Sequence, residues 1–390
     1  MASDKQKALT ALTLLRATCS DALTLLSDGD GPVEKPDERP TLGIIQKDLS
    51  SLLSLIYTAA TKLALSLKPS SPTYSASLTP IKEISERVAA VAHCVLFIDP
   101  NHHGATLFKE AVETVKDVIE ATSSLADAFL AAASTPNPGD EYLSRTGTVH
   151  ELAEKAKNLS LSNALAVQKR WKQDRASLDD AVGELHDMIE RAEADDGADQ
   201  LDADFDDGWA EFGIGSDKKL EVDELARAKK AYTFLRYTSL LHKRVLQDIL
   251  TSQASNTDSP SPGVYDSMCN ASATLLVSAD DFVAALYGPQ EPTRIKEELD
   301  TLQGIDNILC GIIKENFLPV EQQLSAQLEQ LSLSQPTTSS LQRLAPSSAK
   351  WFQTIFEETR LHHANANQSA ISSTSTWDSR STESYDSFGI

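Results

Sequence analysis

Hydrophobic residues recur at intervals of three and four positions along most of the chain. One stretch shows the pattern clearly, with apolar residues at Ile81, Ile84, Val88, Val91, Val95 and Ile98. This spacing places the apolar side chains on one face of an α-helix. Sustained alternation with a period of two, which predicts strands, occurs nowhere. The sequence therefore predicts an all-α protein built from long antiparallel helices joined by short loops.

Proline, glycine and polar clusters divide this pattern into separate helices. The predicted helices cover residues 4–26, 42–67, 80–98, 107–129, 149–159, 165–189, 220–250, 268–286, 292–317 and 320–331. Thr79 and Pro80 form a start signal, with Thr79 as the N-cap and Pro80 at the first helical position. The 292–317 helix fits a coiled-coil dimer or a buried bundle helix equally well. On the 165–189 stripe, Trp171 is expected to be a core residue.

An acidic run from Glu193 to Glu211 interrupts the helical pattern. It holds nine carboxylates and no Lys or Arg. Such a density of like charge predicts a solvated segment without regular structure. Aromatic residues are unusual in a plain linker, and they accumulate at the end of this one. We expect partner binding by Phe205, Asp206, Asp207, Trp209 and Phe212, with the aromatics as anchors. The alternative is that the aromatics fold back and tie down the junction.

The same pattern predicts the domain organisation. We expect an N-terminal helical bundle at 1–192, an acidic aromatic linker at 193–217, a C-terminal helical domain at 218–332 and a Ser/Thr-rich disordered tail at 333–390. The tail has too few apolar residues to offset the entropy lost on ordering. Only residues 350–362 within it could form a helical turn or a docking motif. Periodicity leaves open whether the two halves form separate bundles or one shared bundle.

Motifs that carry chemistry are nearly absent. No nucleophile elbow or zinc-protease motif occurs. Gly208 and Gly213 have the spacing of a phosphate loop, but no Lys-Ser/Thr follows and the surrounding carboxylates would repel phosphate. An EF-hand register centred on Gly208 would put Ala203 and Phe205 at ligand positions, which excludes it. We therefore predict no catalytic residues, no cofactor and no metal site, and we interpret the adjacent His102 and His103 as a polar turn.

Charge and composition narrow the partner class. The chain has 390 residues and a formal charge of −22, which argues against binding nucleic acid or anionic lipid. The longest apolar stretch, 88–98, is too short to span a bilayer. Four scattered cysteines without metal-site spacing fit a reducing compartment. These features predict a soluble intracellular protein with protein partners.

Short motifs suggest regulation. Thr79 precedes Pro80, and Ser259 and Ser261 each precede a proline in a predicted loop. All three are candidate phosphosites, although we favour helix capping as the explanation for Thr79, which makes the serines the stronger candidates. Arg244 and Leu246 match an Arg-x-Leu cyclin-docking peptide, but they lie in a predicted helix, so we interpret that match as accidental.

Three stretches of the sequence stand out by their order. Residues 104–107 open a long helix after a tight turn, residues 142–149 precede the long helix that contains 163–165, and residues 206–209 come ahead of the second helical half. In these places the chain resembles the cyclin-D-binding protein family, also described as cyclin-D-interacting or helix-loop-helix-like inhibitor proteins. The resemblance implies an all-helical, two-part protein of cytoplasm and nucleus. It also implies binding to cyclin or helix-loop-helix regulators, restraint of cell-cycle progression, and no catalytic residues.

The leading interpretation is a non-catalytic adaptor that binds cyclin-like or helix-loop-helix partners and modulates the cell cycle or transcription. The alternative is a bundle scaffold similar to the vinculin and α-catenin group, which would bind cytoskeletal partners.

Overall fold

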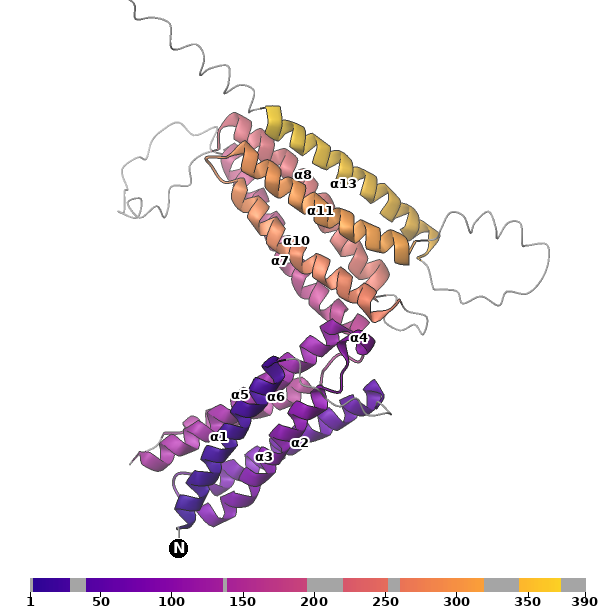
Figure 1. The fold of residues 1–390 in the computed structure, drawn as a ribbon. Coiled ribbons are helices and arrows are strands. Elements are labelled where there is room, and N and C mark those ends of the chain that lie inside the picture. Colours follow the sequence, from indigo (N-terminus) through magenta and orange to yellow (C-terminus); the bar gives the residue numbers. More distant parts are fainter. Residues whose placement is uncertain are drawn as a thin grey trace, which may run out of the picture. The chain divides into compact units, whose positions relative to one another are not determined.

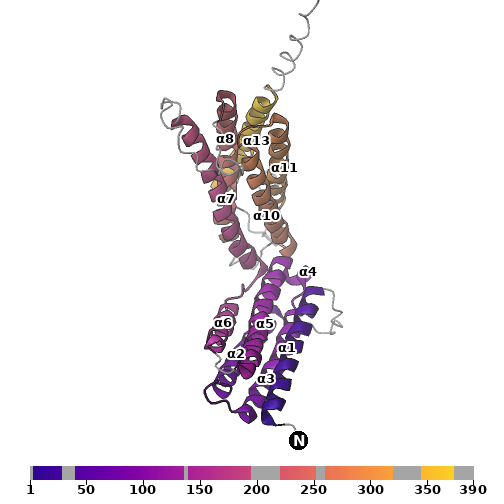
Figure 2. The same ribbon diagram turned by 90° about the vertical axis from the view of Figure 1, so that its left-hand side faces the viewer.

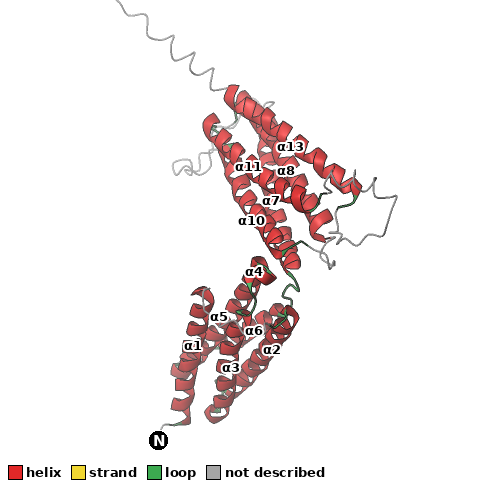
Figure 3. Cartoon of the chain, turned by 45° about the vertical axis from the view of Figure 1, so that its right-hand side comes forward, coloured by secondary structure: helices red, strands yellow, loops and turns green. Residues whose placement is uncertain are grey.

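A computed structural model describes residues 3–28, 40–135, 139–194, 220–251, 260–318 and 344–372. All regular structure in these ranges is helical, as the periodicity predicts. The helices are α1 (Asp4–Asp28), α2 (Leu42–Ser66), α3 (Tyr74–Val95), α4 (Pro100–His103), α5 (Ala105–Ser134), α6 (Glu141–Ala156), α7 (Asn163–Ala194), α8 (Val222–Arg244), the π-helix η3 (Val245–Leu250), α10 (Pro262–Ala285), α11 (Pro292–Asn316) and α13 (Pro346–Ser372). Figure 3 shows these helices and the loops between them.

The chain forms two compact units, residues 1–166 (unit 1) and residues 167–390 (unit 2). In unit 1, five helices form a ring in the order α1, α3, α2, α6, α5 and back to α1, and α3 also contacts α5 across it (Figure 2). Their apolar stripes meet in one core that includes Leu53, Val88 and Val115, all fully buried. The two halves of the chain therefore form separate helical bundles and not one shared bundle.

Unit 2 is built around a second core. α10 packs against α11, α11 against α13, and α13 against α8 (Figure 1). Side chains of α7 complete the bundle, since Leu178 and Leu185 are buried in the same cluster as Phe234 and Phe282 of α8 and α10. α11 is thus a bundle helix, with Leu299, Leu302 and Ile313 almost completely buried.

The division between the units differs from the expected boundary at residue 192. From Val167 onward, α7 belongs to unit 2, because its apolar stripe packs against α8 and α10. An amphipathic stripe shows that a helix is buried on one side but does not name the helices that cover it. The acidic run therefore connects α7 to α8 within one unit, and the expectation that it links the two halves is wrong.

Two further expectations are corrected. The helix assigned to start after Thr79 begins at Tyr74, so Thr79 is not an N-cap and Pro80 lies inside α3, where it is buried. Core packing on both sides of Pro80 outweighs the hydrogen bond that a proline removes from a helix. The expected disordered tail from residue 333 contains α13, which is anchored by the fully buried Phe352.

A contact between distant residues fixes how α5 begins in unit 1. Gly104, the N-cap of α5, has a φ of 104°, which side chains other than glycine rarely adopt. The buried Oδ1 of Asn163 accepts a hydrogen bond of 3.0 Å from the backbone N–H of Leu107, one of the donors left free in the first turn. A Cβ atom on Gly104 would lie 2.0 Å from Cγ of Asn163. Two of the stretches that carry the family resemblance, 104–107 and 163–165, are therefore in direct contact and together form the start of α5.

We expect Asn163→Ala to destabilise unit 1 by about 1–3 kcal/mol, because the N–H of Leu107 would stay buried without a partner. Asn158→Ala, at an exposed position just before α7, is the matched control. Gly104→Ala should cost at least as much, since it adds a strained φ and a steric clash.

Denaturant unfolding and hydrogen exchange at the first turn of α5 measure these costs. The double variant Gly104→Ala/Asn163→Ala should cost less than the sum of the single variants, because truncating Asn163 to a methyl group leaves room for the Cβ at residue 104. If the losses of unfolding free energy in the two single variants add up to the loss in the double variant, the two residues do not act together.

Candidate interaction sites

The acidic aromatic segment lies outside the described residues, so the structure does not place Phe205, Asp206, Asp207, Trp209 or Phe212. It does describe the start of the segment and the residues that follow it. Glu193 near the end of α7 forms an ion pair with Lys229 of α8. The chain resumes at the buried Leu220, directly before α8. The expected docking residues therefore lie between two helices that are joined at this end of unit 2.

The start of α8 is held by a reciprocal capping box. The side chain of Glu221 accepts from the backbone of Glu224, and the Glu224 carboxylate accepts from the N–H of Glu221. Glu224 also accepts a 2.7 Å hydrogen bond from the N–H of Gln290, and Gln290 in turn accepts from Nε of Arg227. These contacts anchor the start of α8 to the loop between α10 and α11.

The candidate phosphosites have different environments. Thr79 is exposed on a continuous helix, and Ser259 lies outside the described residues. Ser261 is exposed and is the N-cap of α10, with Pro262 at the first helical position. A phosphate at this position would face the positive end of the helix dipole. All three phosphosites stay predictions. Of the two described residues, Ser261 has the surroundings that better stabilise a phosphate.

Two other candidates have structural roles. Nδ1 of His103 accepts a 3.0 Å hydrogen bond from the N–H of Asp99, which closes the short α4 turn. Within the described ranges, no group of three His, Cys, Asp or Glu side chains could hold a metal ion. Arg244 pairs with Asp248 at 2.8 Å and lies 4.9 Å from the ring of Trp351. The Arg-x-Leu match thus forms part of a folded helix, at the junction of α8 and η3.

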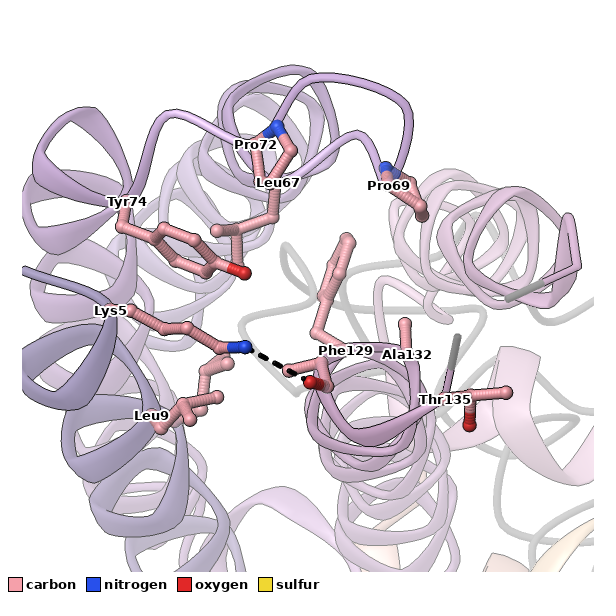
Figure 4. A pocket seen from close by; sticks show the side chains of 11 residues that line it. Lys5, Leu9, Leu67, Pro69, Pro72, Tyr74, Phe129, Ala132 and Thr135 are labelled. Carbon is pink, nitrogen blue, oxygen red and sulfur yellow. Dashed lines mark hydrogen bonds between the residues drawn. The ribbon is translucent and has the colours of Figure 1, made fainter. Parts of the chain in front are cut away.

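A pocket of about 200 Å³ opens at one end of unit 1 (Figure 4). Apolar side chains from α1, α5 and the loop after α2 line it, among them Leu9, Leu67 and Phe129. Lys5 crosses its mouth, donates a 3.2 Å hydrogen bond to the carbonyl of Ala133 and lies 6.0 Å from the ring of Tyr74. This lysine is already engaged with a backbone carbonyl, and the pocket has a smaller volume than a typical ligand site of about 300–1,000 Å³.

The main polar cluster of unit 2 is a chain of hydrogen bonds that links three helices. Ser272 of α10 donates a 2.8 Å hydrogen bond to Asp174 of α7, and its hydroxyl lies 2.9 Å from Nε2 of His242 on α8. The imidazole stacks on Trp171 at 4.3 Å, and the indole N–H donates to the carbonyl of His242. Trp171 is fully buried, which confirms the expectation that it is a core residue.

The residue types of this cluster are those of a hydrolase triad, but their order is different. The serine proton is donated to Asp174, so Nε2 of His242 must carry its own proton to bond the hydroxyl oxygen. Burial, with Arg175 as a second cause, lowers the pKa of His242 to about 3. Since Ser272 and His242 are completely buried, no substrate reaches the hydroxyl and the imidazole does not activate it. The cluster holds α7, α8 and α10 in register.

A second buried pair lies between α8 and α11. Oγ1 of Thr238 donates a 2.6 Å hydrogen bond to Oδ2 of Asp306, which is completely buried. Burial raises the pKa of Asp306 to about 7, and the Thr238 hydroxyl partly opposes this shift. Asp306 therefore resists ionisation in the folded protein.

Sequence reasoning missed both polar clusters. Their members lie 30 to 98 positions apart in the chain and sit within otherwise apolar helix faces. Single Ser, Thr or Asp residues on such faces are common, so the only signal was a carboxylate, Asp306, inside the stripe of the clearest amphipathic helix.

Two apolar helices and the free cysteines are further candidate sites. In the described part of the chain, residues 4–27 and 42–66 are long and apolar enough to cross a membrane, by length and composition only. Both pack one face into the unit 1 core, and core helices pass the same test. The cysteines are free thiols, and burial raises the pKa of Cys19 and of Cys310 to about 12, so these two stay protonated.

We expect Ser272→Ala to destabilise unit 2 by about 1–3 kcal/mol, because the Asp174 carboxylate and the His242 N–H would lose their shared partner in a buried site. Denaturant unfolding followed by tryptophan fluorescence measures this loss, with Trp171 beside the site. Ser267→Ala on the exposed face of α10 is the control. Equal midpoints for the two variants would contradict a stabilising role.

The free energy of unfolding of Asp306→Asn should increase relative to that of the natural protein as the pH rises. The folded pKa of about 7 lies above the unfolded value of 3.8, so the folded protein holds a proton that the unfolded chain releases between these values. Stability contributed by Asp306 therefore falls as the pH rises from about 4 to 7, by at most about 1.4 kcal/mol per pH unit. Unfolding at pH 5, 6 and 7 tests this, with the exposed Asp187→Asn on α7 as control. A pH-independent difference between Asp306→Asn and the natural protein would show that Asp306 ionises normally.

Two sequence profiles of one family match the chain. The profile described as Grap2 and cyclin-D-interacting, N-terminal, matches residues 48–191, and the profile described as Grap2 and cyclin-D-interacting, C-terminal, matches residues 205–308. Together they cover more than half of the chain. A search of the curated proteins finds no match. The gap between the two matched segments, residues 192–204, overlaps the first part of the acidic run, whereas the division of the fold falls between residues 166 and 167.

Proposed function

Because the chain belongs to the Grap2 and cyclin-D-interacting family, we propose that it is a non-catalytic protein-interaction adaptor that binds cyclin-like or helix-loop-helix regulators and modulates cell-cycle progression or transcription. The observation that carries this proposal is the match of both family profiles, one on each half of the chain. The fold alone would not support it, since helical bundles serve many unrelated functions.

The acidic aromatic segment is the proposed docking element. It combines net negative charge with three large aromatic side chains between α7 and α8, whose adjoining ends are held together by the Glu193–Lys229 ion pair. Carboxylates favour a basic groove on the partner and speed encounter, while aromatic residues supply most of the binding energy in interfaces of this kind. A formal charge of −22 makes direct contact with nucleic acid unfavourable. We expect the protein in both cytoplasm and nucleus, where such partners act.

The alternative, a scaffold for cytoskeletal partners, rests on the two bundles of long helices. Its partners would be filaments or junction proteins, so the identity of captured proteins separates the two proposals.

Affinity capture of cyclin D and helix-loop-helix regulators from cell extract tests the adaptor. The triple variant Phe205→Ala/Trp209→Ala/Phe212→Ala should reduce capture at least tenfold, because it removes the three proposed anchors and leaves the charge unchanged. Asp195→Asn/Asp196→Asn/Asp199→Asn, in the same segment, should reduce capture less and mainly at low salt.

Full retention of partners by the aromatic variant, with reduced stability of unit 2, would show that these side chains only tie down the segment. Capture of actin or junction proteins in place of cyclins would instead support the scaffold.

A further inference from the structure

α13 is anchored unevenly in unit 2. Its first half buries three large side chains, Phe352, Ile355 and Phe356. Its second half buries only small or polar ones, of which Thr359, Ala366 and Ala370 are the most buried. α11, which it packs against, buries isoleucine or leucine at nearly every turn. Since apolar stabilisation scales with the area removed from water, the second half of α13 is held less strongly than α11, which it packs against.

Partly exposed contacts of polar side chains add to the α13 interface. The ring of His362 stacks on Tyr237 at 4.5 Å, and Nε2 of His363 lies 3.1 Å from Oδ1 of Asp300. At the other end of α13, Lys314 lies 5.0 Å from the ring of Phe356. Contacts of this kind are readily exchanged for water or for an equivalent group on another molecule.

The chain connection does not require α13 to stay in place. The N–H of Leu344 donates a 3.1 Å hydrogen bond to the carbonyl of Phe317, so the residues on either side of 319–343 meet at the end of α11. Helix–helix connections in bundles commonly need only about 2–8 residues. The sequence provides many more here, enough for α13 to leave the bundle and remain tethered to it.

The matched family segments include the walls of the groove but not the helix that fills it. α8 and most of α11 lie within the C-terminal match, 205–308, whereas α13 lies beyond it. Figure 1 shows α13 (yellow) lying along α8 and α11.

We propose that α13 is a displaceable internal ligand, and that the groove it fills between α8 and α11 binds an amphipathic helix of a protein partner. This inference rests on the proposed function as an interaction adaptor and adds a second docking surface to it. While α13 is bound, the groove is closed to partners.

The contacts of α13 define the helix that could replace it. Such a helix carries large apolar or aromatic residues at one end with the spacing of Phe352, Ile355 and Phe356, which is that of one helix face. Lys314 and Arg244 lie beside aromatic rings at that end of the groove. At the other end, the exposed carboxylate of Asp300 would accept a basic residue, as it does from His363.

Hydrogen exchange on the full-length natural protein gives the first test. Amides of α13 should exchange at least tenfold faster than those of α8, α10 and α11, because α13 opens without unfolding the bundle. Exchange of all four helices at one common rate would overturn the proposal.

A fluorescent peptide of residues 344–372 gives the second test. It should bind full-length Phe352→Ala/Phe356→Ala at least tenfold more tightly than the natural protein, since the weakened internal helix vacates the groove. Gln353→Ala/Arg360→Ala, on the exposed face of the same helix, should behave as the natural protein does. Absence of peptide binding by the double-Phe variant would contradict the proposal, whether its bundle stays folded or melts, because either result makes α13 a permanent part of unit 2.

This test is independent of the proposed function. If the peptide binds but no regulator is captured, the proposal that the groove binds a helix stands and the proposed class of partner is wrong. Capture of cyclin D without peptide binding would retain the adaptor and reject the groove.

Discussion

The packing of Trp171 on His242 decides to which half of the protein α7 belongs. The indole is completely buried, stacks on the imidazole at 4.3 Å and donates its N–H to the backbone of the same residue. On the next turn of α7, Asp174 accepts a hydrogen bond from the hydroxyl of Ser272. A helix with one apolar stripe can be buried against one core only, and these contacts place the stripe of α7 in unit 2.

The location of the proposed docking elements follows from this. With α7 in unit 2, the acidic aromatic segment joins two helices of one bundle. Glu193 at its start pairs with Lys229, and Glu221 just beyond its end caps α8. The groove that α13 fills is built from α8 and α11 of the same bundle. Both proposed docking elements therefore belong to unit 2. In unit 1, the pocket beside Lys5 has a volume of only about 200 Å³, and its lysine is already hydrogen-bonded.

The buried polar groups of unit 2 serve specificity rather than chemistry. An all-apolar interface between helices allows several registers of similar energy, whereas a buried hydrogen bond is satisfied in only one. Asp174 with Ser272 sets α7 against α10, and Thr238 with Asp306 sets α8 against α11. The low pKa of His242 and the raised pKa of Asp306 both result from burial. Perturbed pKa values can mark an active site, but here they belong to buried groups that join neighbouring helices.

The sequence alone determined the helical class, the approximate extent of most helices and the burial of residues such as Trp171, because periodicity of apolar residues is a local property. It also marked the family, through short stretches such as 104–107 and 163–165, although not that Asn163 caps the helix which follows Gly104. Which helices share a core was decided only by the tertiary structure. An apolar stripe is satisfied by any complementary surface, so the sequence could not assign α7 to unit 2, exclude Thr79 as a cap or find the groove that buries Phe352.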